Sequence, residues 1–372
     1  MEVHAVLVNT GGFDAKEILA IQKHAKALGI HKFICLDETE NYYRKVVKYL
    51  LFGNILKNNT YPLSVSAERI SQAIAIAHHV KKLNAAYVAH GSTGAGNDQV
   101  RFDLIFNTLI PNTEIITPIR DQKLSRNEEV EFLKYHAVKM NFEKSAYSIN
   151  KGLWGTSVGG KETLTSHLPL PESAWPTAQT KTGKVKISLY FEKGEFIGIN
   201  NKILSPITAI QQLNLKIKGF GIGRDTHVGD TIIGIKGRVG FEAPAPLLIL
   251  KAHHLLEKHV LTKWQLYWKD QLSAWYGNWL HEGQYLDPVM RNMEAFLEDS
   301  QKHVTGTVFV EVRPGKFDLL GLESKNDLMS PHFGRYGEEN ISWNGSDVKG
   351  FTKIFGNQIA ILERIHEKIK SE

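Results

Sequence analysis

The chain has 372 residues, of which 42% are hydrophobic and 23% charged, and its formal net charge at neutral pH is +6. This length favours two domains, because one hydrophobic core rarely grows past roughly 250 to 300 residues. The composition is typical of a compact α/β protein and excludes a disordered or fibrous chain. Basic residues are interspersed with acidic ones, which indicates a solvated surface and no nucleic-acid partner.

Cysteine content and hydropathy predict the compartment. The single cysteine, Cys35, lies in an apolar run, so we expect a buried thiol that takes no part in chemistry. No apolar stretch approaches the roughly 20 residues that a membrane-spanning helix needs, and no basic segment precedes an apolar one at the N-terminus. We therefore expect a cytoplasmic protein with no membrane partner and no exported form.

The first half of the chain alternates strand-like runs with helix-like segments. The helical segments have apolar residues at helical spacing, as at Ile70, Ala73 and Ala77. This alternation predicts an α/β domain in which crossover helices connect parallel strands. The strand-like runs are residues 3–8, 32–36, 86–89 and 114–117.

The pattern changes near residue 164, after which Thr, Ser, Pro and Gly accumulate up to residue 184. We expect a linker or long loop there, separating the α/β domain at residues 1–164 from an α+β domain at residues 165–372. In the second domain, alternating segments around Lys193-Gly194 and Pro314-Gly315 predict two β-hairpins. An amphipathic helix at the C-terminus is predicted to pack on its own domain or on another subunit.

The segment YVAHGSTGAGNDQVRF, residues 87–102, carries the strongest functional motif. A strand, a glycine-rich loop and a helix follow one another, which places the loop where open α/β sheets bind ligands. The glycines allow backbone amides to approach a phosphate, and Arg101 can bind a carboxylate or phosphate in bidentate fashion. The structural alternative is a plain turn in which Asn97 or Asp98 only caps the helix.

This segment resembles the substrate-binding segment of the argininosuccinate synthase family, which joins citrulline to aspartate with ATP. Three more segments are similar to that family in the same order along the chain, and together they extend over nearly its whole length. The three are TYPLSVSAER at residues 60–69, YSINKGLWGTSVGGKE at 147–162 and GIGRDTHVGDTIIGIKGR at 221–238.

The resemblance implies a fold, an activity and partners. It implies an N-terminal domain like that of the adenine nucleotide alpha-hydrolases, followed by a synthetase and multimerisation domain. ATP with Mg²⁺ would be the cosubstrate, citrulline and aspartate the other substrates, and a homotetramer the assembly, with the C-terminal helix reaching a neighbouring subunit. The reaction would pass through a citrullyl adenylate and release AMP and pyrophosphate, in arginine biosynthesis.

The resemblance also implies roles for individual residues, with no protein nucleophile and no metal ligand. Asp98 and Arg101 would position the substrates. Citrulline would be bound by Tyr61, Ser66, Asn97, Arg101, Ser148 and Ser157. Aspartate would be bound by Thr93, Asn97 and Asp98. ATP would be bound by Asn9, Gly91, Ser92, Thr93, Gly94 and Gly96.

Some of these residues have plain structural alternatives. Tyr61, which precedes Pro62, could simply anchor a turn, and Ser66 could simply be the N-cap of a helix. The chain also departs from the family at two positions associated with citrulline. Gly229 stands where the family has a carboxylate, and Phe241 where it has a tyrosine. The neighbouring Asp230 and Glu242 could substitute for the missing polar groups.

The opening segment VLVNTGG, residues 6–12, could be the loop that binds pyrophosphate in the N-type ATP pyrophosphatases. It lacks the hydroxyl residue that follows the Asp of that loop, because Asp14 is followed by Ala15 and Lys16. It resembles more closely the family's second strand, which ends in an Asn-x-Gly turn. We therefore expect the strand, phosphate loop and helix that open the family fold to be missing before Met1, through a late start codon or a truncated gene.

This expectation has two consequences. The strand at residues 3–8 would have an unpaired edge, and the chain as given would have weak or absent activity. The main alternative function is accordingly a decayed, catalytically silent paralogue that keeps the fold and part of the amino-acid pocket. A tRNA-modifying enzyme of the same superfamily is disfavoured by the single cysteine and by the lack of a basic stripe.

Two further patterns are weaker. His253, His254, Glu257 and His259 could suggest a metal site, but their spacing fits a half-buried helix better. Four tryptophans recur at helical spacing, which favours packing or a subunit interface over base stacking. They are Trp264, Trp268, Trp275 and Trp279.

Overall fold

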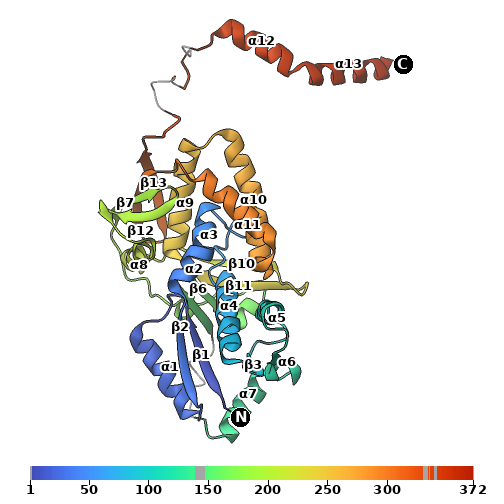
Figure 1. The fold of residues 1–372 in the computed structure, drawn as a ribbon. Coiled ribbons are helices and arrows are strands. Elements are labelled where there is room, and N and C mark those ends of the chain that lie inside the picture. Colours follow the sequence, from blue (N-terminus) through green and yellow to red (C-terminus); the bar gives the residue numbers. More distant parts are fainter. Residues whose placement is uncertain (1, 139–146, 330–333, 335, 339–341, 372) are drawn as a thin grey trace. The chain divides into compact units, whose positions relative to one another are not determined.

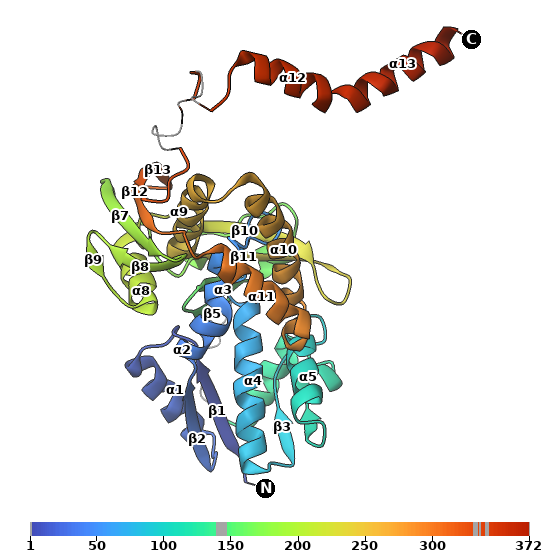
Figure 2. The same cartoon turned by 45° about the horizontal axis from the view of Figure 1, so that its top comes forward.

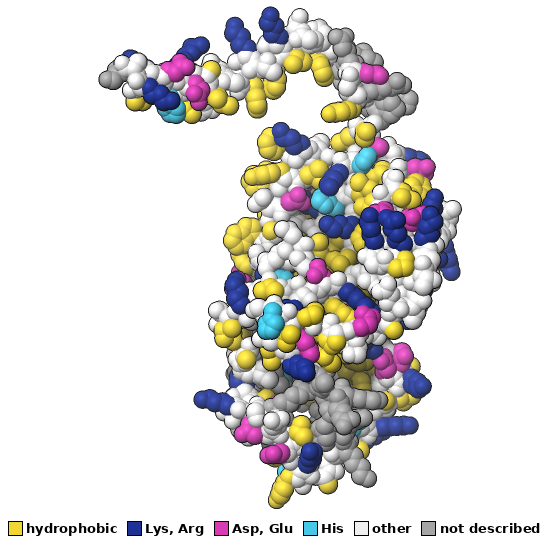
Figure 3. Space-filling view, turned by 180° about the vertical axis from the view of Figure 1, so that it is seen from behind, with side chains coloured by type: hydrophobic (Ala, Val, Ile, Leu, Met, Phe, Trp, Pro, Cys, Tyr) yellow, Lys and Arg dark blue, Asp and Glu magenta, His cyan; other side chains and the backbone are white. Residues whose placement is uncertain are grey.

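The computed structural model describes residues 2–138, 147–329, 334, 336–338 and 342–371. The chain separates into two compact units, Met1–Lys325 and Asn326–Glu372 (Figure 1). The smaller unit contains helices α12 (Gly345–Phe355) and α13 (Asn357–Ser371), neither of which has a buried residue. Figure 3 shows hydrophobic side chains gathered along one side of this unit. The amphipathic character predicted for the C-terminal helix is thus confirmed.

The first half of the large unit has the predicted parallel strands. Strand β1 (His4–Asn9) pairs in parallel with β2 (Lys32–Asp37) across helix α1 (Ala15–Ala27). Strand β3 (Tyr87–Ala89) pairs in parallel with β4 (Glu114–Ile116) across helix α5 (Asp98–Leu109). The predicted crossover arrangement is therefore confirmed for each pair.

The two pairs are separate sheets. Among the described residues β1 pairs only with β2, so its other edge has no strand partner. Helix α4 (Ser66–Leu83) packs against both β1 and α5, and it runs alongside both pairs in Figure 2. Further short helices complete this half. They are α2 (Thr39–Tyr42), η1 (Tyr43–Val47), α3 (Lys48–Phe52), α6 (Pro118–Asp121) and α7 (Arg126–Tyr135).

The prediction that Cys35 is buried is wrong. Cys35 is exposed in β2, a strand that contains no buried residue. A two-stranded sheet offers little area to bury, so its side chains stay partly open to solvent. The apolar run around Cys35 therefore predicted the strand correctly but not its burial.

Antiparallel strands dominate the second half, as predicted. One sheet has the order β10-β11-β6-β5 and the other the order β13-β12-β7-β8-β9. The first contains β5 (Ser148–Gly152), β6 (Gly155–Gly159), β10 (Arg224–Asp230) and β11 (Lys236–Glu242). The second contains β7 (Val185–Glu192), β8 (Glu195–Ile199), β9 (Lys202–Ile203), β12 (Gly306–Arg313) and β13 (Lys316–Glu323).

Both predicted hairpins are confirmed. Strands β7 and β8 meet at Lys193-Gly194, whose φ angles are 48° and 80°. Positive φ at both turn residues suits the right-handed twist of the flanking strands. Strands β12 and β13 meet at Pro314-Gly315, where Gly315 has a positive φ of 72° and the proline ring fixes a negative φ at Pro314.

Four long helices cover the second half. They are α8 (Pro206–Ile217), α9 (Pro244–Val260), α10 (Lys263–His281) and α11 (Pro288–Ser300). None of the described helices is both long and apolar enough to cross a membrane. Short 3₁₀ turns η3 (Lys161–Leu164), η4 (Glu172–Ala174) and η5 (Gln284–Leu286) lie in the connections.

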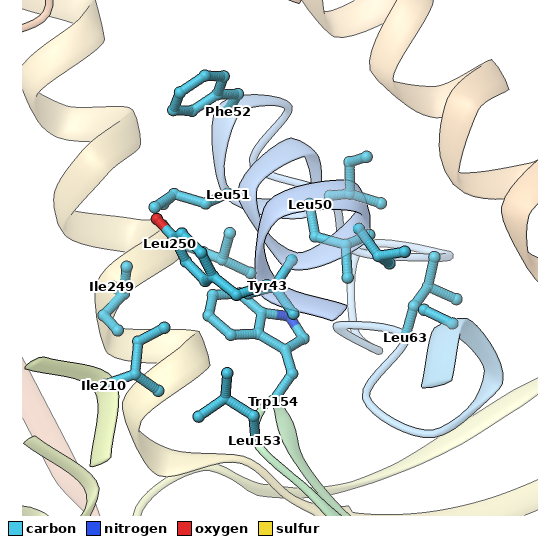
Figure 4. Packing of buried hydrophobic residues seen from close by; sticks show 14 of the residues in the cluster. Tyr43, Leu50, Leu51, Phe52, Leu63, Leu153, Trp154, Ile210, Ile249 and Leu250 are labelled. Carbon is cyan, nitrogen blue, oxygen red and sulfur yellow. The ribbon is translucent and has the colours of Figure 1, made fainter. Parts of the chain in front are cut away.

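One hydrophobic core extends across residue 164, where the sequence predicts a domain boundary. Figure 4 shows Trp154, from the turn between β5 and β6, packed among Leu50 and Leu51 of α3 and Ile249 of α9. All four side chains are almost completely buried. The two halves of the large unit are therefore joined by packing as well as by chain connections.

Candidate functional site

A cavity of about 710 Å³ lies where the loop after β3 meets helices α4 and α5 and strands β10 and β11. The structure brings most of the predicted site residues together in its wall. The predicted residues that line it are Tyr61, Ser66, Gly91, Ser92, Thr93, Gly96, Asn97, Asp98, Arg101, Ser148 and Ser157.

Asn9 and Gly94 do not line this cavity. The side-chain oxygen of Asn9 accepts hydrogen bonds from the backbone N–H groups of Gly11 and Phe13, at 3.1 and 3.3 Å. The carbonyl of Gly94 accepts from Gln99. Asn9 therefore shapes the opening loop, and Gly94 the loop after β3, from outside the cavity.

A charge cluster lies at the start of α5, with Arg101 buried and Asp98 partly exposed. Asp98 accepts from Arg69 Nε and Arg101 Nη1, both at 2.9 Å. Burial raises the pKa of Asp98, but the two guanidinium groups outweigh it, so the pKa lies below its ordinary value. Two arginines therefore face one ionised carboxylate, and the surplus positive charge can be balanced by an anionic ligand.

Arg101 is held from behind by the end of helix α10. Its Nε donates to the carbonyl of His281 at 2.9 Å, and its Nη2 lies 3.3 Å from His281 Nδ1. Burial and the neighbouring Arg101 lower the pKa of His281 to about 2, so the imidazole is neutral. Only 4% of Arg101 is exposed, and the residue lines the cavity.

Sequence reasoning missed both Arg69 and His281. Arg69 lies on α4 and is the last residue of the segment TYPLSVSAER, which resembles the family. Its place in that segment is the signal that could have found it. His281 lies 180 residues from Arg101, and no local pattern connects them.

The structural alternatives fail for Ser66 and Asn97. Helix α4 begins at Ser66, and its N-cap residue Val65 makes no side-chain cap. The hydroxyl of Ser66 is buried without a hydrogen-bond partner, which is rare unless a ligand or water satisfies it. Asn97 makes no side-chain cap either, and its oxygen accepts from Ile232 N at 2.8 Å. For Tyr61 the anchoring role holds, because its hydroxyl accepts from Val65 N.

The loop after β3 leaves its backbone accessible. No atom lies within 4 Å of the position that a Cβ would take at Gly91, so a ligand can approach closely there. The loop is fixed by His90, whose Nδ1 accepts from Ser92 N and whose Nε2 lies 2.8 Å from Asp103 Oδ1. Such a loop before a helix N-terminus suits an anionic group.

Strands β5 and β6 close the opposite wall. Asn150 accepts from Arg69 at 2.6 Å and donates to Ser157 at 3.4 Å. Ser157 is therefore connected to the charge cluster through Asn150. Ser148 lines the cavity from the exposed end of β5.

Neither Asp230 nor Glu242 supplies the polar group missing at Gly229 and Phe241. Asp230 pairs with Lys236 at 2.5 Å on the surface, and Glu242 pairs with Arg224 at 3.1 Å. Phe241 is fully buried, and its ring centroid lies 5.3 Å from that of Tyr61. The departures from the family at these positions are therefore not compensated by the adjacent acids.

Of the two weaker patterns, the histidines include a buried core residue, whereas most of the tryptophans are exposed. His253 is fully buried and contacts Asn54 and Gln301. No group of three or more His, Cys, Asp or Glu residues in the described part of the chain could hold a metal ion. Three of the four tryptophans on α10 are more than half exposed, so they do not serve the core of this unit. They are Trp264, Trp268 and Trp275.

Parallel strands with a glycine-rich loop, facing an antiparallel sheet across a polar cavity, define an α/β nucleotide-binding fold followed by a half built on antiparallel sheets. Two family models match the chain: the arginosuccinate synthase N-terminal HUP domain at residues 1–139 and the arginosuccinate synthase C-terminal domain at residues 147–362. The chain belongs to the argininosuccinate synthase family.

Individual relatives agree with this assignment. Argininosuccinate synthase of Sulfolobus acidocaldarius is 32% identical over 358 residues, which covers 95% of this chain and 90% of the relative. The enzyme of Xanthomonas campestris is 33% identical over 98% of this chain and 92% of its own length. That of Methanocaldococcus jannaschii is 32% identical over 97% and 91%. The predicted family and fold class are therefore confirmed.

Proposed function

We propose that this protein is an argininosuccinate synthase, which ligates a citrulline-type ureido amino acid to aspartate with ATP and releases AMP and pyrophosphate. The observation that carries the proposal is the charge cluster of Arg69, Asp98 and Arg101 in the cavity wall beside the open loop at Gly91. The cluster suits a substrate carboxylate, and the loop suits the nucleotide.

The reaction takes place in two steps, adenylation of the ureido oxygen and displacement of AMP. The ureido oxygen attacks the α-phosphorus of ATP, and pyrophosphate leaves with the electrons of the broken P–O bond. The amine of aspartate then attacks the ureido carbon, and AMP leaves with the former ureido oxygen while the amine loses a proton. Both steps depend on positioning and charge stabilisation, so no protein nucleophile is needed.

The residues of the cavity take complementary roles. Arg101 binds the carboxylate of the ureido substrate. The buried hydroxyl of Ser66, which has no partner among the described residues, forms a hydrogen bond with the same substrate. Thr93, Asn97 and Asp98 face aspartate at the start of α5. His281 and Arg69 are positioning residues, because they hold Arg101 and Asp98 in place.

ATP is a substrate here, and Mg²⁺ enters with its phosphates. The described residues contain no cluster of acids that could hold a resident ion. Mg²⁺ commonly binds to substrate phosphates and water with few protein ligands, which fits this site. Bound with ATP, Mg²⁺ would supply positive charge for the pyrophosphate that leaves.

A catalytically silent paralogue is the second candidate, and one observation favours it. The amides of Gly11 and Phe13 are bonded to Asn9, and Asp14 caps helix α1 by accepting from Glu17 N at 2.8 Å. These groups are therefore not free to bind phosphates. With β1 and β3 in separate sheets, the described residues form the amino-acid half of the site more completely than the triphosphate half.

Citrulline labelled with ¹⁸O in the ureido group distinguishes the two candidates. The full chain is incubated with ATP, Mg²⁺, aspartate and the labelled citrulline, and AMP is analysed by mass spectrometry. Transfer of ¹⁸O into AMP supports the synthase. Binding of a ureido ligand without AMP supports the silent paralogue, and absence of both contradicts the proposal.

We also propose that the protein is a cytoplasmic homotetramer in which helix α13 contacts a neighbouring subunit. Ile359, Leu362 and Ile365 are each about half exposed or more within their own unit, and burying them would be favourable. Light scattering of the full chain and of a chain ending at residue 343 tests this assembly. A tetramer for the full chain and a smaller species for the shortened one is expected.

A further inference from the structure

Gly229 leaves an open position in the cavity wall that His227 fills. The two residues are two apart on β10, so they face the same side of the strand. A Cβ added at Gly229 would lie only 2.6 Å from His227 Nε2. The imidazole therefore takes the volume that a side chain at position 229 would occupy.

His227 has an unsatisfied polar atom. Only 5% of the residue is exposed, and its ring is stacked on Tyr61 with centroids 5.3 Å apart. Its Nδ1 is buried and has no hydrogen-bond partner. Burial, followed by the charge of Lys57, lowers the pKa of His227, so the ring is neutral. A neutral ring nitrogen in a cavity wall matches the N–H or C=O of an uncharged amide.

The charges around this end of the cavity disfavour an ammonium group. Asp98 is already shared by two arginines, and Asp230 pairs with Lys236 on the surface. Among the lining residues that the structure describes, these are the carboxylates of the cavity. Glu282, in the wall of the second cavity, is offset by Lys57, whose charge also acts on His227. An ammonium group placed near His227 would therefore meet Lys57 and acids that already have a cationic partner.

A second cavity continues from this position. It has a volume of about 430 Å³ and shares Asp230 and Thr231 with the first. Asn58 lines it and lies 3.4 Å from the Cβ position of Gly229. Trp275 and Trp279 give it an apolar wall. A group larger than an ammonium can therefore extend past Gly229.

We propose that the ureido substrate carries an acylated α-nitrogen, whose amide bonds to His227 and whose acyl group extends past Gly229 toward the second cavity. This inference rests on the proposed function and names its substrate class. The ureido end, the carboxylate and the chemistry of both steps stay the same. The α-nitrogen changes from a cation to a neutral amide.

Calorimetric titration of the full chain with two probes tests the inference. The probes are L-citrulline and Nα-acetyl-L-citrulline, each without nucleotide. We expect the acetylated probe to bind roughly 10- to 100-fold more tightly, because only it avoids an unpaired buried charge. Equal binding, or tighter binding of citrulline, overturns the inference and leaves the proposed function in place. No binding of either probe overturns both.

A variant that restores the carboxylate sharpens the test. The double change His227→Val with Gly229→Glu frees the volume and places a carboxylate there. It is expected to shift the ratio of the two affinities toward citrulline by at least about tenfold. The matched control is Val228→Glu, which adds the same charge to a side chain that is 54% exposed on the other face of β10.

The control should leave the ratio of affinities unchanged. A double variant that folds, judged by its thermal unfolding, and keeps the wild-type preference overturns the role given to His227. If the double variant does not fold, the comparison of the two probes on the unchanged chain decides the matter.

Discussion

The opening β1-α1-β2 unit and the region around helix α9 each contain an amphipathic helix, but the two helices differ in burial. Helix α1 has no buried residue, whereas α9 buries residues along its whole length, including His253 and Glu257. The opening unit is attached to the rest by few polar links, among them Thr10 to Glu68 and Lys151 to Glu17. An amphipathic helix gains most of its stability from what it packs against, so the opening unit should unfold locally first.

The largest effect is expected from Lys269→Met in the buried region. Lys269 Nζ lies 3.0 Å from Glu257 Oε2 and donates to the carbonyl of Phe52, and both side chains are fully buried. Removing the cation leaves the carboxylate unpaired, which should lower the free energy of unfolding by about 3 to 5 kcal/mol. Urea denaturation followed by fluorescence measures the change.

Two controls test this reason. Lys302→Met breaks an exposed pair with Asp299 and should have little effect. The double change Lys269→Met with Glu257→Leu removes both charges and should recover most of the loss. If the double variant is as unstable as the single one, packing and not charge is responsible.

Glu68 of α4 accepts a hydrogen bond from Thr10 at the edge of the opening unit and should make stability depend on pH. Burial raises its pKa to about 7, against the opposing effects of Arg69 and of the hydrogen bond from Thr10. The ordinary value is 4.5, so the folded state binds the proton more tightly than the unfolded state. Its contribution to stability is therefore present below pH 4.5 and is lost as the pH rises through about 7.

The change Glu68→Gln should remove this dependence. At pH 8 the variant is expected to be more stable than the unchanged chain by up to roughly 3 kcal/mol, and near pH 4 the two should be equal. Denaturation at several pH values measures the difference. A constant difference across this range would contradict the assignment of the proton to Glu68.

A smaller effect is expected from Asp14→Ala, which removes the N-cap of α1. Asp14 accepts from Glu17 N at 2.8 Å, and the loss of such a cap is worth about 1 kcal/mol. Hydrogen exchange should become faster in α1 while the global unfolding midpoint hardly moves. The matched change Thr262→Ala at the cap of α10 should lower the global midpoint instead. Equal effects on the global midpoint would show that the two regions unfold together.

Much of the fold follows from the sequence because it is set locally. The hairpin at Lys193-Gly194 needs only alternating strands and a turn with positive φ. The link from Arg101 to His281 was beyond prediction, because it joins two helices through tertiary packing. That the His227 ring fills the space beside Gly229 could have been predicted from the sequence, because residues two apart on a strand lie on the same face.

The smallest effect concerns Cys35, which marks the open face of β2. The thiol is exposed, so one equivalent of an alkylating reagent should react with the folded protein. Partial burial, followed by the charge of Asp37, raises the pKa of the thiol above 9.0, so the reaction should be slow at pH 7 and speed up as the pH rises. Labelling is measured by mass spectrometry in the absence of denaturant. A thiol that reacts only after urea is added would show that this face of β2 is covered in solution, which would remove much of the contrast between the opening unit and the region around α9.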